Sequence, residues 1–424
     1  MTSTWAMKKK TNGKLRGRLN ARGYEQIDGQ HYTAQNIAAP VTNEHTVRVV
    51  MTLMCANPEW VAEVVDVEGA FLQGRFTDGE VLHMEVPDGM TQYYGDRADT
   101  VLLLNVPLYG TKQAAHCFYA ALVEAIKKRQ YARSKADPCL YYVTVDGQLA
   151  LMVSWVDDLI LLGPQKVVDV MKKDLGEAFV CKAEGPLKEF VGSKIDLSRD
   201  ANGLGTAKFT QPVLVQKLAD EYHVEVGAKP PTTPANAGLV LVKGDGSWPL
   251  DEKAITEYRS ATATCMYMMR WSRPDIYNAT RGQARHMSAP RYPHLTALEK
   301  LMRYIVATRE RGLVLRPNRT WDGSMGHKFV IHGRSDSDYA ANTDDRRSIS
   351  GGRVCLEGCP VTFRSQTQKF VTLSVTEAEG AAGVMTAQDM LYVYRLLESI
   401  GLQVELPMLL EMDNKGAVDL ANNW

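Results

Sequence analysis

The sequence predicts an α+β protein with more than one domain. The chain has 424 residues, which is more than a single hydrophobic core usually serves. Short β-rich runs, such as VAEVVDV (61–67) and ALMVSWV (150–156), alternate with segments of helical spacing, such as AAHCFYAALVEAIKKR (114–129). The proline- and glycine-rich segment AKPPTTPANAG (228–238) predicts a linker between regions of different pattern.

The pattern divides the chain into three expected domains, which comprise residues 1–185, 186–325 and 326–424. The second begins with a hairpin-like pair, FVGSKIDLS and LGTAKFT, and the connection between them contains the strong turn signal Asn202-Gly203. Helical patterns follow the linker and run from Tyr258 to about Arg311.

The third expected domain has the element order β-β-β-α-β-α. KFVIHGRSD, GGRVCLEG and PVTFRS are typical of strands, and the segment that starts at Ser374 is typical of one long amphipathic helix stopped by Gly401. PMLLEMD is expected to form a fourth strand, and NKGAVDLANN is expected to begin a second helix.

Composition excludes several protein classes. The seven cysteines are scattered and odd in number, which favours a reducing compartment over a disulfide framework. No apolar run reaches the ~18 residues of a membrane helix, and no signal peptide is visible. We therefore expect an intracellular protein without a membrane partner.

Charge is unevenly distributed although the formal net charge is zero. The residues before the first acid, Glu25, carry a basic run made of Lys8, Lys9, Lys10, Lys14, Arg16, Arg18 and Arg22. The run is either a solvated arm or a surface that contacts phosphates, as nucleic-acid-binding proteins have.

Two adjacent carboxylates interrupt an apolar segment in SWVDDLILLG (154–163). Burying Asp157 and Asp158 there is costly unless something compensates their charge. A tight turn can present both carboxylates at one rim, and Asp66, near the end of another apolar strand, is available as a third ligand. Such a set can hold two Mg²⁺ ions, which prefer oxygen ligands. The alternative is an ordinary turn with solvated aspartates.

Ordered sequence blocks identify a family. RGRLNARGYEQIDGQHY resembles K-A-R-L-V-A-R-G-[FY]-x-Q-x-x-G-x-x-Y, and VVDVEGAFLQG resembles D-V-x-x-A-F-L-x-G. VLHMEVPDG, LYGTKQAAHCFYAAL, WVDDLILLG, YRSATATCMYMMRWSRPDI, DSDYAANTDDRRSISGG and LSVTEAEG follow in the same order. Together the blocks resemble the reverse transcriptase–RNase H portion of a copia-type LTR retrotransposon polyprotein, nearly from end to end.

The resemblance implies a right-hand polymerase (fingers, palm and thumb), then a connection and an RNase H-like α/β domain. Asp66, Asp157 and Asp158 match the palm aspartates that hold Mg²⁺, or Mn²⁺ in its place. Trp155 replaces the usual tyrosine before Val-Asp-Asp, which puts the positioning of the primer end in doubt.

The same resemblance implies residues that bind the substrate. Phe71 matches the aromatic residue that excludes a 2′-hydroxyl, and its alternative role is simple core packing. Arg18 and Arg22 match the fingers block that contacts the incoming triphosphate, or else they are solvated surface. Gln113 matches a residue beside the nucleotide pocket. Lys182 is a weak candidate for the proton donor to pyrophosphate, and the alternative is an exposed lysine on a loop.

Three further carboxylates match the RNase H set, namely Asp336, Glu377 and Asp413, and these would also hold magnesium. Glu377 has an alternative, because Ser374-Val-Thr-Glu377 is a capping box. Asp338 is an alternative to Asp336, because side chains two apart share one face of a strand. The family's last block is missing, so we expect a truncated domain with little RNase H activity.

The leading hypothesis is an RNA-directed DNA polymerase whose partners are an RNA template, a DNA primer, RNA–DNA hybrid and dNTPs. It would act in the cytoplasm, inside a virus-like particle, with the nucleus as a second location. One alternative is a catalytically inactive nucleic-acid-binding relic of a degenerate element, which the departures from the blocks favour. A weaker alternative is a metal-dependent nuclease alone. The sequence leaves the oligomeric state open.

Overall fold

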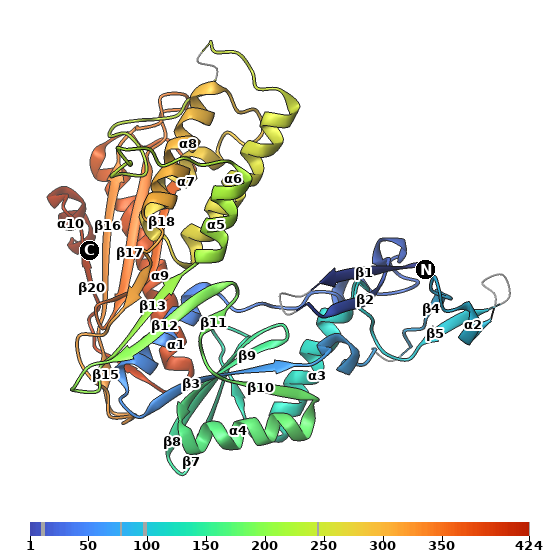
Figure 1. The fold of residues 1–424 in the computed structure, drawn as a ribbon. Helices are drawn as coiled ribbons and strands as arrows, with labels where there is room; N and C mark the ends of the chain where they lie inside the picture. Colours follow the sequence, from blue (N-terminus) through green and yellow to red (C-terminus); the bar gives the residue numbers. More distant parts are fainter. Residues whose placement is uncertain (10–12, 77–78, 96–99, 244–245, 424) are drawn as a thin grey trace. The chain divides into compact units, whose positions relative to one another are not determined.

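A computed structural model describes residues 1–9, 13–76, 79–95, 100–243 and 246–423 (Figure 1). The chain forms two compact units, and it passes between them more than once. Unit 1 comprises Met1–Thr42 and Val61–Pro186, and unit 2 comprises Asn43–Trp60 and Leu187–Trp424. Both units mix helices and strands, as the sequence predicts.

Unit 1 is built on a six-stranded sheet with the order β10-β3-β9-β8-β7-β6. Its strands are β3 (Trp60–Val67), β6 (Ala132–Arg133), β7 (Leu140–Val145), β8 (Gln148–Trp155), β9 (Asp158–Pro164) and β10 (Cys181–Pro186). Helices α3 (Ala114–Lys128) and α4 (Gln165–Ala178) share one buried cluster with this sheet. The core therefore lies between the two helices and one face of the sheet, and side chains that alternate with the core residues project from the other face.

Shorter elements complete unit 1. Two hairpins are formed by β1 (Ser3–Lys9) with β2 (Leu15–Ala21) and by β4 (Leu82–Glu85) with β5 (Val101–Leu104). Single helical turns are η1 (Gly23–Glu25), η2 (Ala34–Asn36), η3 (Ala70–Gln73) and α2 (Thr91–Tyr94).

Unit 2 contains two four-stranded sheets. The first has the order β11-β12-β13-β14 and consists of β11 (Glu189–Phe190), β12 (Ser193–Arg199), β13 (Gly205–Thr210) and β14 (Leu313–Leu315). The second has the order β18-β17-β16-β20 and consists of β16 (Ile331–Asp338), β17 (Ile349–Leu356), β18 (Cys359–Thr367) and β20 (Leu409–Glu411). Strands β15 (Lys328–Phe329) and β19 (Gln403–Val404) form a separate parallel pair.

Helices of unit 2 pack around these sheets. They are α1 (Glu44–Ala56), α5 (Pro212–Glu221), α6 (Glu252–Trp271), η4 (Pro274–Ile276), α7 (Tyr277–Ala284), α8 (Tyr292–Ala307), α9 (Val375–Ser399) and α10 (Lys415–Asn422). Helices α5, α6 and α8 share one apolar cluster. Helix α9 covers one face of the second sheet so closely that a Cβ on Gly352 would collide with Thr386.

Most predicted elements are confirmed. The hairpin around Asn202-Gly203 is β12–β13, and the predicted order β-β-β-α-β-α is present as β16, β17, β18, α9, β20 and α10, with the short β19 added before β20. The segment 228–238 contains neither helix nor strand. All seven cysteines are free. No described helix combines the length and the apolar character that crossing a bilayer requires.

Helix α1 lies in a unit that its place in the sequence does not suggest. Unit 1 ends at Pro186, beside the predicted boundary at 185, but residues 43–60 belong to unit 2. The Thr46 hydroxyl is 2.7 Å from the Tyr392 hydroxyl of α9, and the Arg48 guanidinium stacks on Phe363 of β18. A helix that is buried on every side, as EHTVRVVMTLMCA is, needs partners all round.

Candidate active sites

Asp157 and Asp158 lie at a tight turn between two buried strands. Trp155 of β8 pairs with Asp158 of β9, so the turn itself consists of Val156 and Asp157. Val156 has a φ of +57°, in the left-handed region that β-branched residues rarely adopt. Strain of this kind costs about 1–3 kcal/mol and persists only where the surroundings impose it. The strands therefore hold the two aspartates in a fixed position.

Asp66 lies on the strand next to this turn. Strand β3 neighbours β9, and the Val67 N–H donates to the Asp157 carbonyl oxygen at 3.0 Å. Val65 and Val67 belong to the helix-covered core, so the Asp66 side chain between them projects from the opposite face of the sheet. The predicted site residues Asp66 and Asp157 are thus brought together.

Negative charge accumulates at Asp66. Burial raises the pKa of the Asp66 carboxyl, and the nearby carboxylates of Asp157, Glu184 and Glu68 raise this pKa further. Lys182 is the neighbour that opposes the rise. A bound divalent cation would compensate these repelling carboxylates, and oxygen ligands are the kind that magnesium prefers. The residues present therefore fit a metal ion. We call Asp66, Asp157 and Asp158 the first carboxylate group.

Lys182 lies in a strand and not on the loop that the sequence suggested as the alternative. It pairs with Asp66 across β10 and β3, and its side chain is exposed. Glu184, two residues further along β10, was not singled out from the sequence. The segment CKAEGP lacks apolar alternation, so only the register with β3 reveals that Lys182 and Glu184 are neighbours of Asp66.

Phe71 and Arg18 meet on one aromatic ring. The rings of Phe71 and Tyr109 have centroids 5.0 Å apart, and the Arg18 guanidinium lies 4.2 Å from the Tyr109 centroid. The Ala21 N–H donates to the Tyr109 carbonyl oxygen at 2.7 Å, which ties the end of β2 to this ring. Tyr109 thus joins two predicted site residues, although the sequence analysis did not name it.

Glycine permits this close approach of backbones. Gly110 has a φ of +90°, and a Cβ there would collide with the Ala21 carbonyl. The predicted blocks LYGTKQ and RGRLNARGYEQ are therefore in contact through Gly110 and Ala21.

The other two predicted substrate residues differ in exposure. Arg22 is exposed. Gln113 is fully buried, where its Oε1 accepts from Gln26 at 2.9 Å and its Nε2 donates to the His31 carbonyl at 3.3 Å. In this arrangement Gln113 supports the segment that carries Gln26 and His31 from within.

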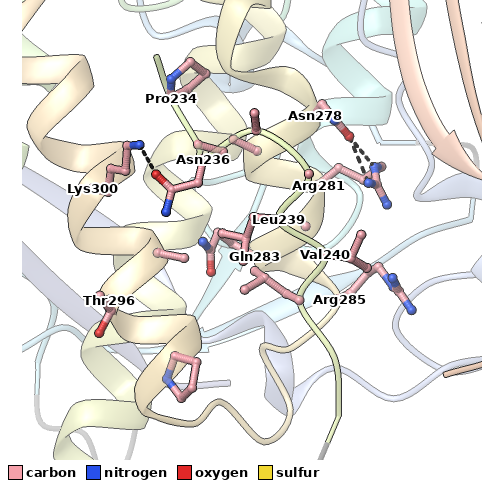
Figure 2. A pocket seen from close by; sticks show the side chains of 18 of the residues that line it. Pro234, Asn236, Leu239, Val240, Asn278, Arg281, Gln283, Arg285, Thr296 and Lys300 are labelled. Carbon is pink, nitrogen blue, oxygen red and sulfur yellow. Dashed lines mark hydrogen bonds between the residues drawn. The ribbon is translucent and has the colours of Figure 1, made fainter. Parts of the chain in front are cut away.

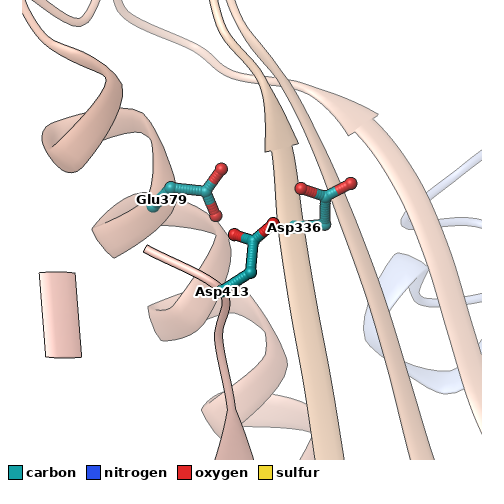
Figure 3. A group of neighbouring side chains, drawn as sticks. All are labelled: Asp336, Glu379 and Asp413. Atoms are coloured by element: carbon teal, nitrogen blue, oxygen red, sulfur yellow. The ribbon is translucent and has the colours of Figure 1, made fainter. Parts of the chain in front are cut away.

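A second carboxylate group lies in unit 2 and consists of Asp336, Glu379 and Asp413. One oxygen from each residue lies within 4.8 Å of the others. Figure 3 shows Asp336 on β16, Glu379 on α9 and Asp413 just after β20, with the three side chains grouped together. Within the described ranges, no other set of three acidic, histidine or cysteine residues meets this distance. The first carboxylate group does not meet it either.

Glu379 is the buried member of this group. Its side chain is 3% exposed. Its Oε1 accepts from the Ser337 N–H at 3.0 Å and from the Ser337 hydroxyl at 2.8 Å. Its Oε2 is buried and has no hydrogen-bond partner in the described part of the chain. Burial raises the pKa of Glu379, and Asp336 and Asp413 raise it further, although Ser337 opposes them. An orphaned buried carboxylate oxygen beside two other carboxylates fits a divalent cation.

The structure does not bring the predicted residue Glu377 into this group, and Glu379 is the glutamate of α9 that lies beside Asp336 and Asp413. The Ser374 hydroxyl accepts from the Glu377 N–H at 3.1 Å, and Glu377 Oε2 accepts from the Leu373 N–H at 2.7 Å. Both are capping bonds at the start of α9, where orphan N–H groups attract a carboxylate. Of the two candidates Asp336 and Asp338, the one that lies in this group is Asp336.

Comparisons with known proteins cover both units. A family model described as reverse transcriptase (RNA-dependent DNA polymerase) matches residues 1–234. The retrovirus-related Pol polyprotein from transposon TNT 1-94 of Nicotiana tabacum is 29% identical, over 99% of this chain and 31% of its own length. That from transposon RE1 of Arabidopsis thaliana is 30% identical, over 99% of this chain and 27% of its own length. The chain thus spans about three tenths of the length of these curated relatives.

One solved structure, a foamy viral protease-reverse transcriptase in complex with double-stranded DNA, matches with 12% identity and a TM-score of 0.26. The match covers 98% of this chain and 58% of the foamy viral chain.

Proposed function

Because this chain belongs to the reverse transcriptase (RNA-dependent DNA polymerase) family, we propose that it extends a DNA primer on an RNA template with dNTPs. Its relatives are Pol polyproteins of copia-type retrotransposons. In the proposal, the six-stranded sheet of unit 1 is the palm and the β1–β2 region belongs to the fingers. The hairpin β12–β13 grips the primer, and the helices after the linker form the thumb and connection.

The observation that carries the proposal is the contact between Asp66 and the Asp157 turn. Two carboxylates on neighbouring strands repel each other and raise the pKa of Asp66. In the proposal Asp66, Asp157 and Asp158 hold magnesium, or manganese in its place. When bound there, the metal would activate the primer 3′-hydroxyl and stabilise charge on the leaving pyrophosphate.

The remaining residues of unit 1 have supporting roles in the proposal. Phe71 borders the sugar of the incoming nucleotide and excludes a 2′-hydroxyl. Arg18, held flat on Tyr109, and the exposed Arg22 would receive the triphosphate, since guanidinium groups suit bidentate phosphate contacts. Lys182 holds its ammonium beside Asp66, where a proton could pass to the leaving group.

A primer-extension assay on poly(rA)·oligo(dT) with magnesium tests this function directly. We expect extension by the full chain, and its loss in Asp157→Asn. A folded chain that binds the primer–template but does not extend it would instead support the inactive, nucleic-acid-binding alternative.

We also propose that the second carboxylate group cleaves the RNA strand of an RNA–DNA hybrid. The orphaned Oε2 of Glu379 carries this proposal. Asp336, Glu379 and Asp413 would hold magnesium, which when bound supplies an activated water for attack on the phosphodiester. The sequence predicts little RNase H activity for this chain. Weak magnesium-dependent cleavage of the RNA strand that disappears in Asp336→Asn is therefore the expected result. Cleavage that survives this change would exclude the site.

A further inference from the structure

A basic pocket lies beside the second carboxylate group. Its volume is about 660 Å³, and it is enclosed by residues 234–241, by helices α7 and α8, and by Asp338 and Ile349 of the second sheet (Figure 2). The cations in its described lining are Arg281, Arg285 and Lys300, and the lining acid is Asp338. The lining thus has more positive than negative charge.

Arg281 carries a half-buried charge that only neutral groups contact. Its N–H groups donate to Asn278 Oδ1 at 2.8 Å, to Ser365 Oγ at 3.1 Å and to Thr367 Oγ1 at 3.0 Å. Burial lowers the pKa of Arg281 to about 10, the neighbouring Arg285 lowers it too, and Asp338 opposes them. A guanidinium has five N–H donors, and these bonds engage one on Nε and one on each terminal nitrogen. Two donors remain for a ligand.

Arg285 adds a second guanidinium on the same side. It lies four residues after Arg281, so the two side chains are neighbours along one helix face. In the described part of the chain, the Arg285 side chain makes no hydrogen bond and no ion pair. Two like charges held this close repel each other, and Asp338 is the acid of the lining that opposes them. An oxyanion between them would remove this repulsion and accept from both.

The sheet leaves an open path from this pocket to Asp336. Asp336, Gly351 and Ser365 pair in one row across β16, β17 and β18, so they share one face. A Cβ on Gly351 would meet only the Asp336 carbonyl oxygen within 4 Å, so no side chain obstructs the middle of the row. Arg281 contacts Ser365 at the far end, about two strand spacings or roughly 10 Å from Asp336.

Another cation lies on the same face, one row beyond Asp336. Arg353 pairs with Arg334 in the next row of this face, and its side chain is exposed. Arg334 forms an ion pair with Glu411. Among the described residues Arg353 makes no such pair, so its charge remains available.

We propose that this face binds the phosphate backbone of a nucleic-acid strand, with Arg281 and Arg285 taking one phosphate while another lies at Asp336. The assignment rests on the proposed function of the second carboxylate group. A strand advances about 3.4 Å per nucleotide, so roughly three nucleotides cover the distance. A free phosphate ion could fill the pocket but could not also reach the carboxylates, which is why a polymer is the occupant.

The experiment measures how hybrid binding by the full chain depends on salt. A fluorescein-labelled RNA–DNA hybrid is titrated in EDTA at several NaCl concentrations, so no cleavage occurs. Arg285→Ala is the test variant because the Arg285 side chain has no hydrogen bond or ion pair to lose in the described part of the chain. Arg309→Ala is the matched control, since Arg309 is exposed and likewise unpaired in the described chain. Any binding elsewhere on the chain is common to all variants.

We expect Arg285→Ala to flatten the slope of log K against log salt by about 0.7–0.9, the value of one phosphate contact. Arg285→Ala/Arg353→Ala should flatten it further, and Arg309→Ala should leave it unchanged. Equal slopes in the test and control variants would overturn the proposal. A second arm adds inorganic phosphate as competitor. If Arg285→Ala abolishes phosphate binding but leaves the salt slope of hybrid binding equal to that of the wild type, the pocket binds a free ion and the proposal fails.

Failure of the nuclease proposal gives a different result. If the wild type cleaves no RNA with magnesium but Arg285→Ala still flattens the slope, the backbone site stands and the cleavage proposal falls. If the wild type cleaves and Arg285→Ala matches it in both slope and KM, the cleavage proposal stands and the backbone site falls.

Discussion

Replacing Glu379 with glutamine tests the second carboxylate group without changing its packing. The two side chains have nearly the same shape, and glutamine can still accept the hydrogen bonds from Ser337. Glu377→Gln is the matched control, because Glu377 lies one helical half-turn away and caps α9. Only Glu379→Gln should affect binding of magnesium in unit 2.

In metal-free protein two opposing terms decide the effect of Glu379→Gln on stability. Neutralising the acceptor weakens two charge-assisted bonds from Ser337 by ~1 kcal/mol each. It also removes a buried charge, whose net cost in a protein is several kcal/mol when uncompensated. The raised pKa of Glu379 indicates that the second term is larger. The variant should therefore be at least as stable as the wild type at neutral pH.

The pH dependence has a definite sign. The folded pKa of Glu379 is above its ordinary value, so the folded state keeps this proton to a higher pH than the unfolded state. Metal-free wild type should lose stability as the pH rises from the ordinary carboxyl range through the folded pKa, and then level off. Glu379→Gln should lack this part of the loss, whereas Glu377→Gln should retain it.

Magnesium should stabilise the wild type and the control but not Glu379→Gln. A ligand at about ten times its Kd adds ~1.4 kcal/mol. For a unit of this size that is a rise in Tm of about 3–5 °C. The assay is thermal unfolding with and without magnesium across pH 4–8. A magnesium-dependent rise that persists in Glu379→Gln and disappears in Glu377→Gln would refute the assignment of Glu379.

Four further substitutions test unit 1. Asp66→Asn or Asp157→Asn should abolish primer extension and leave the Tm unchanged or higher, because each removes a repelling charge; extension within a few-fold of the parent would exclude the site. Phe71→Ala should admit ribonucleotides, at a cost below the ~3–5 kcal/mol of a fully buried phenylalanine, and unchanged dNTP/rNTP discrimination in a folded variant would make Phe71 a packing residue. Val156→Gly should relieve about 1–2 kcal/mol of left-handed strain and cost about 0.5–1 kcal/mol of added chain entropy. The expected Tm is therefore unchanged or slightly higher. A Tm lowered by several degrees would show that Val156 is unstrained.

Elements with strong local patterns were predictable from the sequence. The strand around Asp66, the turn at Asp157 and the helix after Ser374 each follow from periodicity and capping signals that act within a few residues. Asp336 lies among the last residues of β16 and Asp413 lies two residues after β20, in the strand segments that the same signals predict. Contacts that depend on register between distant strands, such as Lys182 beside Asp66, have no local signal.

The placement of Glu379 rather than Glu377 beside the other carboxylates has a physical cause that the sequence contains. The segment SVTEAEG offers two glutamates, and a capping box assigns the first of them to the helix end. The Glu377 carboxylate accepts from the Leu373 N–H, which holds it at the start of the helix. The second glutamate, Glu379, points to the sheet and meets Ser337. Giving the capping signal more weight than the family register would have selected Glu379.

Helix α1 shows why domain boundaries were harder to predict than elements. Eleven of its thirteen residues are buried, so the helix cannot lie on a surface, and its partners lie more than three hundred positions later at Phe363 and Tyr392. The strand that carries Asp66 begins four residues after α1 ends. The chain therefore enters the core of unit 2 immediately before it forms the first carboxylate group of unit 1. Burial of α1 therefore depends on residues late in the chain, and a division into consecutive domains does not describe this.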